Sequence, residues 1–334
     1  MSVEPSRPSP TPLFILSLPR SGSTLLQRML GAHADIATVN EPHFLLPLLY
    51  AAKEEGVFAE YGHWVTALGV QDFIKHLPQG SDDFRAAIRS WARDLYARAA
   101  GRPVTYFLDK TPKYSLVAQE LVATFPDSPF IVLYRNPLAN VASLVETFGG
   151  GSWNLDRFAI DVHVGLERLA ALTMQPPPGL KLHTLRYEDL VARPAETLRE
   201  IFAFLGLPDD AGVLEEFGKV RLNGRISDPN SRLPSYGTLR KESVDKWKTT
   251  LASPLRVRWC RKYLEWIGRE RLAHLGYDTD ELLEQLRALP VDRRILARDL
   301  LEMPYRRASD RLETFMLRRR YRVWREGRRW YGLR

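Results

Sequence analysis

Short apolar runs alternate along the first two thirds of the chain with segments in which apolar residues recur every three or four positions. The short runs predict buried strands, and the periodic segments predict amphipathic helices. We expect strands over residues 13–18, 104–108, 130–134 and 180–185. We expect helices over residues 24–30, 116–124, 138–147, 156–173 and 195–205. Because strands alternate with helices, the pattern predicts an α/β fold in which helices flank a parallel sheet.

Two segments depart from this alternation. Residues 44–100 show helical periodicity and contain several aromatic residues, so we expect a helical insertion after the first strand–helix unit, on the acceptor side of the fold. The polar stretch 212–248 contains Pro229 and Pro234 and predicts a long loop, of which residues 223–248 would form a lid over a ligand. Further helices are expected over residues 255–275 and 280–289.

The two ends of the chain differ from the middle in composition. Residues 1–11 are rich in proline and predict a disordered arm, so the α/β domain is expected over residues 12–289. Residues 290–334 predict a basic helical tail. Between residues 318 and 334 there are eight arginines against a single acid, Glu326, and these account for seven of the chain's eight net positive charges.

This distribution of charge limits the partners of the protein. The rest of the chain is nearly neutral, so no sequence-specific nucleic-acid groove is expected. Apolar residues recur at roughly helical spacing in residues 312–334 among the arginines. Such a helix can rest on an anionic membrane surface, bind a polyanion, pack on a second subunit, or dock on its own domain.

Composition excludes several other classes of protein. The 334 residues are 45% hydrophobic and 26% charged, which is ordinary for a globular chain. The single cysteine, Cys260, rules out an intramolecular disulfide and a cysteine-based zinc cluster, and it fits a reducing, cytoplasmic compartment. The longest apolar stretch, residues 44–52, contains Pro47 and is too short to span a bilayer.

The turn at residues 19–24 is the first candidate binding site. It follows a predicted strand and opens a helix, whose first N–H groups and partial positive charge attract anions, as in a P-loop. Arg20 adds a cation, while Ser23 and Thr24 add hydroxyls; the alternative is that one hydroxyl merely caps the helix. The Walker pattern is absent, which disfavours a magnesium-dependent kinase or NTPase, although Asp109 at a strand end is typical of one.

A second anion site is predicted after the strand at residues 130–134. Arg135 leaves the carboxyl end of that strand, and Ser143 lies about two turns into the following helix. A guanidinium and a hydroxyl placed in this way can bind one phosphate. The alternative is an ordinary ion pair and a small packing residue.

Four motifs together resemble the sulfotransferases that use 3'-phosphoadenosine-5'-phosphosulfate (PAPS). The segment LPRSGSTLLQRML (residues 18–30) resembles the family's phosphosulfate loop in the arginine form of the tyrosylprotein and bacterial branches. FIVLYRNPLANVASL (residues 130–144) resembles the 3'-phosphate motif, with Asn136 where the family usually has aspartate. Residues 185–208 match another family block, and RKESVDKWK (residues 240–248) resembles the loop that closes on the 3'-phosphate.

The resemblance implies PAPS as sulfuryl donor, a hydroxyl-bearing acceptor and no metal. It implies that Arg20 and Lys110 stabilise the bridging oxygen and that Glu41 is the base, as in the tyrosylprotein branch. The alternatives are that His43 is the base or that Glu41 is a plain carboxylate at a helix start. Cytosolic members have a histidine where this chain has Pro112. The implied donor-binding residues are Arg20, Ser21, Gly22, Ser23, Thr24, Leu25, Arg135, Ser143, Tyr187, Arg240, Lys241 and Trp247.

The acceptor itself stays open between tyrosyl, carbohydrate, lipid and small-molecule hydroxyls. Two other functions also remain: a kinase or NTPase with a degenerate P-loop, and a non-catalytic anion-binding protein attached through its basic tail.

Overall fold

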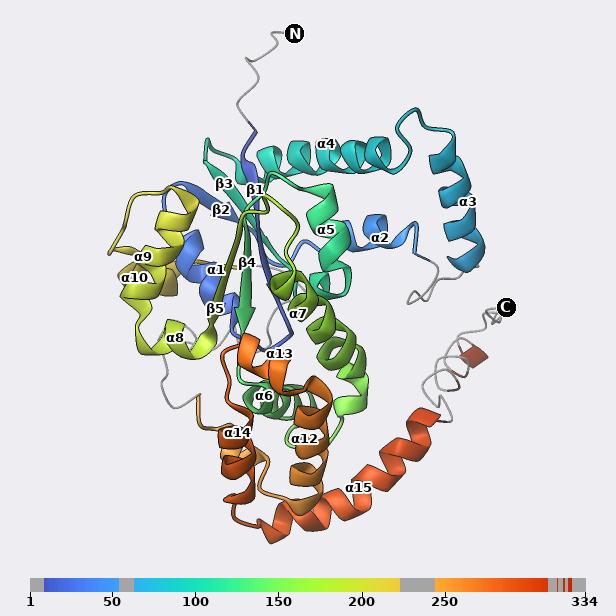
Figure 1. The fold of residues 1–334 in the computed structure, drawn as a ribbon, viewed down its shortest axis with the longest axis vertical. Coiled ribbons are helices and arrows are strands. Elements are labelled where there is room, and N and C mark those ends of the chain that lie inside the picture. Colours follow the sequence, from blue (N-terminus) through green and yellow to red (C-terminus); the bar gives the residue numbers. More distant parts are fainter. Residues whose placement is uncertain are drawn as a thin grey trace.

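The computed structural model describes residues 9–53, 63–222 and 244–311, together with Leu317, Tyr321, Trp324 and Arg325 (Figure 1). Five parallel strands form one sheet in the order β2-β3-β1-β4-β5. The strands are β1 (Thr11–Ser17), β2 (Ile36–Thr38), β3 (Tyr106–Lys110), β4 (Phe130–Tyr134) and β5 (Leu182–Arg186). The predicted α/β fold with a parallel sheet flanked by helices is therefore confirmed.

Helices make up most of the remaining described residues. In the first half of the chain they are α1 (Ser23–Gly31), α2 (Leu45–Tyr50), α3 (His63–Lys75), α4 (Ser81–Ala100), α5 (Ala118–Thr124), α6 (Pro137–Gly149) and α7 (Leu166–Met174). In the second half they are α8 (Tyr187–Ala192), α9 (Pro194–Leu205), α10 (Val213–Glu216), α11 (Trp247–Thr250), α12 (Pro254–Ile267), α13 (Arg269–His274), α14 (Thr279–Arg287) and α15 (Arg293–Arg311). Shorter turns are η1 (Pro112–Val117), η2 (Leu155–Phe158), η4 (Phe217–Lys219) and the π-helical η3 (Asp161–Gly165).

Both faces of the sheet are buried, which explains why the strands read as continuous apolar runs. Leu13 and Ile15 of β1 face the layer that contains α1, α8 and α9. Phe14 and Leu16 face the opposite layer, which contains α4, α5, α6 and α7. Figure 1 shows these layers on either side of the sheet, with α12, α13 and α14 below its carboxyl edge and α15 leading away toward the C-terminus.

Two predicted helices are divided differently in the structure. The helix expected over residues 156–173 consists of η2, η3 and α7. Within the π-helical turn η3, the Tyr263 hydroxyl donates to the Val162 carbonyl at 2.7 Å. The helix expected over residues 255–275 breaks at Gly268, whose φ is 83°.

The predicted loop 212–248 begins with α10 and η4 and ends with α11, so the expectation was wrong at both ends. Residues 223–243 of the predicted lid lie outside the described residues. The expected disordered arm also extends too far, because Thr11 begins β1 with its N–H donating to the Thr105 carbonyl at 3.0 Å. Residues 1–8 lie outside the described residues.

Three helices occupy the described part of residues 44–100, between β2 and β3. The last of them, α4, packs on the sheet, with the Tyr96 and Phe107 rings stacked at a centroid distance of 4.6 Å. Of all the helices in the described ranges, none combines the length and the apolar character that a bilayer crossing requires.

Candidate functional site

The loop between β1 and α1 lies where the order of the strands places β2 and β3 on one side of β1, and β4 and β5 on the other. Such a switch point is where open α/β sheets bind ligands. Arg20 and Gly22 both have left-handed backbones, with φ of 70° and 91°. A Cβ at Gly22 would lie 2.3 Å from Cδ2 of Tyr187, so only glycine fits this turn.

The start of α1 faces this loop. The N-cap residue of α1 is Gly22, which provides no side-chain cap for the first turn. Backbone N–H groups at a helix start are ordinarily satisfied by a cap, by water or by a ligand. The helix therefore presents an uncapped N-terminus, with its partial positive charge, at the turn that contains Ser23 and Thr24.

The structure brings the two predicted anion sites together. The Arg135 Nη1 atom donates to the Arg20 carbonyl at 2.8 Å, and Arg20 Nε donates to Ser143 Oγ at 3.2 Å. Asn140, one turn before Ser143 on α6, donates from Nδ2 to the Pro19 carbonyl at 2.8 Å. It also donates to the Ser21 hydroxyl at 3.1 Å. Helix α6 thus holds the β1–α1 loop at residues 19–21.

Lys110 links the loop to the predicted base. Its side chain is 1% exposed, and Nζ donates to Thr24 Oγ1 at 3.1 Å and to Glu41 Oε1 at 2.5 Å. The second Glu41 oxygen lies 3.3 Å from Nε2 of His43. Burial raises the pKa of Glu41, but the His43 hydrogen bond and the Lys110 charge outweigh it and hold that pKa below its ordinary value. Glu41 is therefore ionised at neutral pH.

Asp109 lies on the other face of the sheet from Lys110, since neighbouring strand residues point to opposite faces. The hydroxyls of Tyr96 and Tyr114 donate to its Oδ2 at 2.6 Å and 2.9 Å. The aspartate that favoured a magnesium-dependent kinase or NTPase is therefore held away from the β1–α1 loop. Burial raises the pKa of Asp109 to about 6, although these hydrogen bonds oppose the rise.

We expect Asp109→Asn to remove one pH dependence of stability. The carboxyl binds its proton more tightly in the folded state, with a pKa of about 6, than at the ordinary value of 3.8. The wild-type free energy of unfolding therefore falls as pH rises through this window, by on the order of 3 kcal/mol. The asparagine variant has no such titration.

The measurement is urea unfolding of both proteins between pH 4.5 and 7.5. Other groups titrate alike in wild type and variant, so they cancel in the difference. The free energy of unfolding of the wild type minus that of Asp109→Asn should fall as pH rises to about 6 and then level off. A difference that stays constant across the whole range would contradict the raised pKa.

Three other predicted donor-binding residues occupy distinct places. Tyr187 begins α8 and is 8% exposed, and the Arg135 guanidinium carbon lies 4.6 Å from its ring centroid. Leu25 is buried on α1. Trp247 begins α11 and is 3% exposed within the core. Arg240 and Lys241 lie outside the described residues.

The departure at Asn136 is accommodated locally. Its side-chain oxygen accepts from the Leu138 N–H at 2.9 Å and caps α6, as an aspartate would. Its own N–H donates to Glu188 Oε1 at 3.0 Å. The substitution therefore preserves the start of the helix that holds the loop.

Comparisons with known proteins agree with this geometry. A family model described as the sulfotransferase family matches residues 12–211. Nodulation protein NoeE of Sinorhizobium fredii (strain NBRC 101917 / NGR234) is 30% identical over 304 residues, which cover 81% of this chain and 67% of the relative. Protein-tyrosine sulfotransferase 1 of Danio rerio is 24% identical over 276 residues, covering 80% of this chain and 72% of that protein.

A solved structure is similar over nearly its whole length. The sulfotransferase domain from the curacin biosynthetic pathway superposes with a TM-score of 0.52 and 26% identity, covering 82% of this chain and 99% of that domain. Because the family model covers more than half of the chain and the relatives extend over most of it, the chain belongs to the sulfotransferase family.

Proposed function

We propose that the protein transfers a sulfuryl group from PAPS to a hydroxyl of its acceptor. The observation that carries this proposal is the network in which Arg135 donates to the Arg20 backbone and Arg20 donates to Ser143. It joins two anion-binding elements, the uncapped start of α1 and the start of α6, at one edge of the sheet. A nucleotide with a phosphate on its ribose and a phosphosulfate at its other end needs two such sites.

The residues present fit this donor. Guanidinium groups, hydroxyls and backbone N–H groups are the partners that phosphate and sulfate oxygens prefer. Arg135 and Ser143 would hold the 3'-phosphate, and residues 20–25 with Lys110 would hold the phosphosulfate. When bound, PAPS supplies the electrophilic sulfuryl group. The Tyr187 ring at the start of α8 would contact the adenine of the nucleotide.

Within this site, Lys110, Glu41 and His43 would have separate roles in the reaction. Lys110 places a buried positive charge between the β1–α1 loop and Glu41, where negative charge on a leaving oxygen can be stabilised without a reorganisation of solvent. Glu41 is ionised and 10% exposed, so it can accept the proton of an acceptor hydroxyl. His43, on its other oxygen, orients the carboxylate.

Ligand-dependent thermal unfolding tests the proposal against its alternatives. Adenosine 3',5'-bisphosphate (PAP) should raise the unfolding midpoint, while ATP with Mg²⁺ should not. The reverse result would favour a kinase or NTPase, and no response to either nucleotide would favour a non-catalytic protein. Turnover of PAPS with phenols, sugars, lipids and tyrosyl peptides would then identify the acceptor class.

Arg135→Ala should raise the KM for PAPS by about 10- to 100-fold, and Ser143→Ala should raise it less. A charged hydrogen bond to a phosphate is worth roughly 1.5 to 3 kcal/mol, and a 3'-phosphate far from the sulfur contributes mainly to binding. Steady-state kinetics with varied PAPS measure this, with Arg193→Ala as control, because that exposed arginine pairs with Glu196 away from the loop. Unchanged PAP affinity in both variants would show that Arg135 and Ser143 do not bind the 3'-phosphate.

Attachment of residues 312–334 to an anionic membrane, a polyanion or a second subunit remains a prediction of the sequence. The exposed side chains of Leu317, Tyr321 and Trp324 belong to this segment. The other residues of the segment, apart from Arg325, lie outside the described part of the chain.

A further inference from the structure

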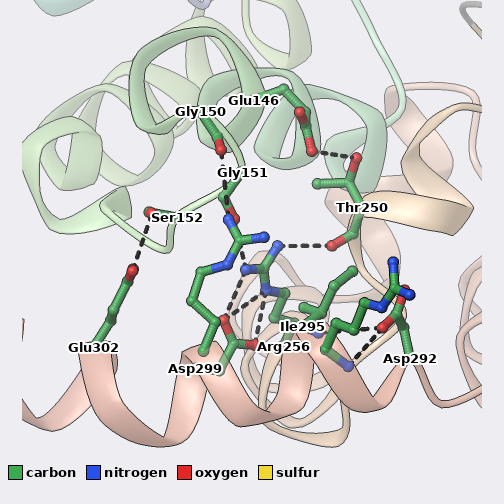
Figure 2. Close-up of polar contacts among 12 residues, drawn as sticks. Glu146, Gly150, Gly151, Ser152, Thr250, Arg256, Asp292, Ile295, Asp299 and Glu302 are labelled. Atoms are coloured by element: carbon green, nitrogen blue, oxygen red, sulfur yellow. Dashed lines mark hydrogen bonds and ion pairs between the residues drawn. The ribbon is translucent and has the colours of Figure 1, made fainter.

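A buried ion pair docks the first turns of α15 on the rest of the protein (Figure 2). Arg256 of α12 is 1% exposed and Asp299 of α15 is fully buried. Arg256 Nε donates to the two Asp299 oxygens at 3.1 Å and 2.8 Å, and Nη2 donates to Oδ1 at 2.7 Å. A buried aspartate is therefore neutralised by a guanidinium in a forked arrangement.

The same guanidinium reaches two further segments. Its Nη1 donates to the Thr250 carbonyl at the end of α11, at 2.8 Å. Its Nη2 donates to the Gly151 carbonyl just after α6, at 2.7 Å. Thr250 in turn donates from its hydroxyl to Glu146 Oε1 on α6, at 3.0 Å (Figure 2). One side chain thus ties together α6, α11, α12 and α15.

This cluster contacts α6, the helix that holds the candidate site. Glu146 is three residues beyond Ser143 on α6, so the two side chains project from neighbouring turns of that helix. Ser143 accepts from Arg20, and Asn140 a turn earlier donates to the β1–α1 loop. The position of α6 along its axis therefore affects the geometry of the loop, and the Arg256 cluster fixes the end of α6 away from the loop.

Two further contacts of α15 involve the same end of α6. The Ser152 hydroxyl donates to Glu302 Oε1 at 3.3 Å, and Arg298 Nη1 donates to the Gly150 carbonyl at 3.4 Å. Met303 is 5% exposed, whereas Leu301 is 78% exposed. The docked face of α15 thus covers the turn at residues 150–152.

We propose that Asp299 is a positioning residue for the nucleotide site, so that α15 braces the α6 anion site through Arg256. The inference rests on the proposed use of PAPS. If the ion pair were purely structural, removal of one partner would lower only the stability of the fold, because it would leave a buried charge without its partner. A brace also changes nucleotide affinity, because Ser143 and Asn140 lie on the helix that it fixes.

The first test compares Asp299→Asn with the matched control Asp280→Asn. Asp280 accepts a forked pair from Arg269, with both distances 2.7 Å, but both side chains of that pair are 69% exposed. Asp299→Asn should weaken PAP binding, measured by calorimetry, by about 3- to 30-fold. It should raise the KM for PAPS in parallel, with kcat and the KM for the acceptor unchanged. The control variant and a chain truncated after Leu317 should bind PAP as wild type does.

A second variant removes the possibility that Asp299→Asn simply fails to fold. Arg256→Met combined with Asp299→Leu replaces the pair by apolar groups of similar size, a change that buried pairs often tolerate. This variant should keep the wild-type circular dichroism spectrum while losing the polar links to Thr250 and Gly151, and its PAP affinity should fall as in Asp299→Asn.

The outcomes separate the two hypotheses. Wild-type PAP affinity in whichever variant retains the native spectrum would overturn the brace, as would a lower unfolding midpoint without a change in affinity. If the wild-type protein itself bound no PAP, the proposed use of PAPS would be wrong instead.

Discussion

Replacement of Lys110 by methionine is expected to lower kcat by about 10²- to 10³-fold, with PAP affinity changed by only a few fold. Removal of one preorganised donor at a site of developing charge typically costs this much. Methionine fills the space of the lysine stem, and the Lys110 side chain is 1% exposed, so the loss falls on the charge rather than on packing. Single-turnover rates with saturating PAPS measure the chemical step directly.

Removal of the Arg20 guanidinium is expected to lower kcat to a similar extent. Its φ of 70° is unfavourable for most side chains, so Arg20→Gly removes the guanidinium while relieving the backbone. A loss of turnover in Arg20→Gly therefore cannot be attributed to strain. Lys75→Met serves as the control, because Lys75 is exposed and pairs with Asp72 on α3. Wild-type turnover in either site variant would exclude that residue from the mechanism.

The strands were predictable from the sequence to the extent that both of their faces are covered. Residues 130–134 are an unbroken apolar run and form β4 within the bounds predicted for them. Strand β2 has only three residues, and so short a run carries no periodicity that distinguishes it from a loop. The ends of β3 were misplaced by two residues because Asp109 and Lys110, although polar, continue the strand.

Residue type and strand ends together identified several members of the candidate site. Arg20, Lys110 and Arg135 all follow or end strands, and parallel strands that end at one edge of a sheet bring such residues close together. Their interactions could not be predicted. That Asp109 faces Tyr96 rather than the loop depends on which face of β3 each residue occupies, and a prediction that ended the strand at residue 108 could not settle it.

The contacts that hold the site were missed for a different reason. Asn140 has a sequence signal, since it lies one turn before Ser143 on the same helix, yet an asparagine within a predicted helix is commonplace. The pair between Arg256 and Asp299 joins residues 43 positions apart on separate helices. No local pattern relates them, and only packing of α15 against α12 brings them into contact.

Glu41→Gln is expected to lower kcat by about 10²- to 10⁴-fold while PAP binding is preserved. The glutamine keeps the shape of the side chain but cannot accept the proton of the acceptor hydroxyl. His43→Asn, a change compatible with the φ of 59° at that position, should cost much less, because His43 only orients Glu41. The reverse ranking of these two variants would assign the base to His43.

The pH profile gives a second, independent readout of this base. A general base must be ionised, and the pKa of Glu41 lies below its ordinary value of 4.5. Protonation of Glu41 should therefore not lower the activity between pH 8 and 5.5. The activity should fall for this reason only at lower pH. In Lys110→Met the desolvation that raises this pKa remains, while an opposing charge and hydrogen bond are lost. The acidic limb of the residual activity should then move toward neutral pH, and an unshifted limb would show that Lys110 and Glu41 do not act together.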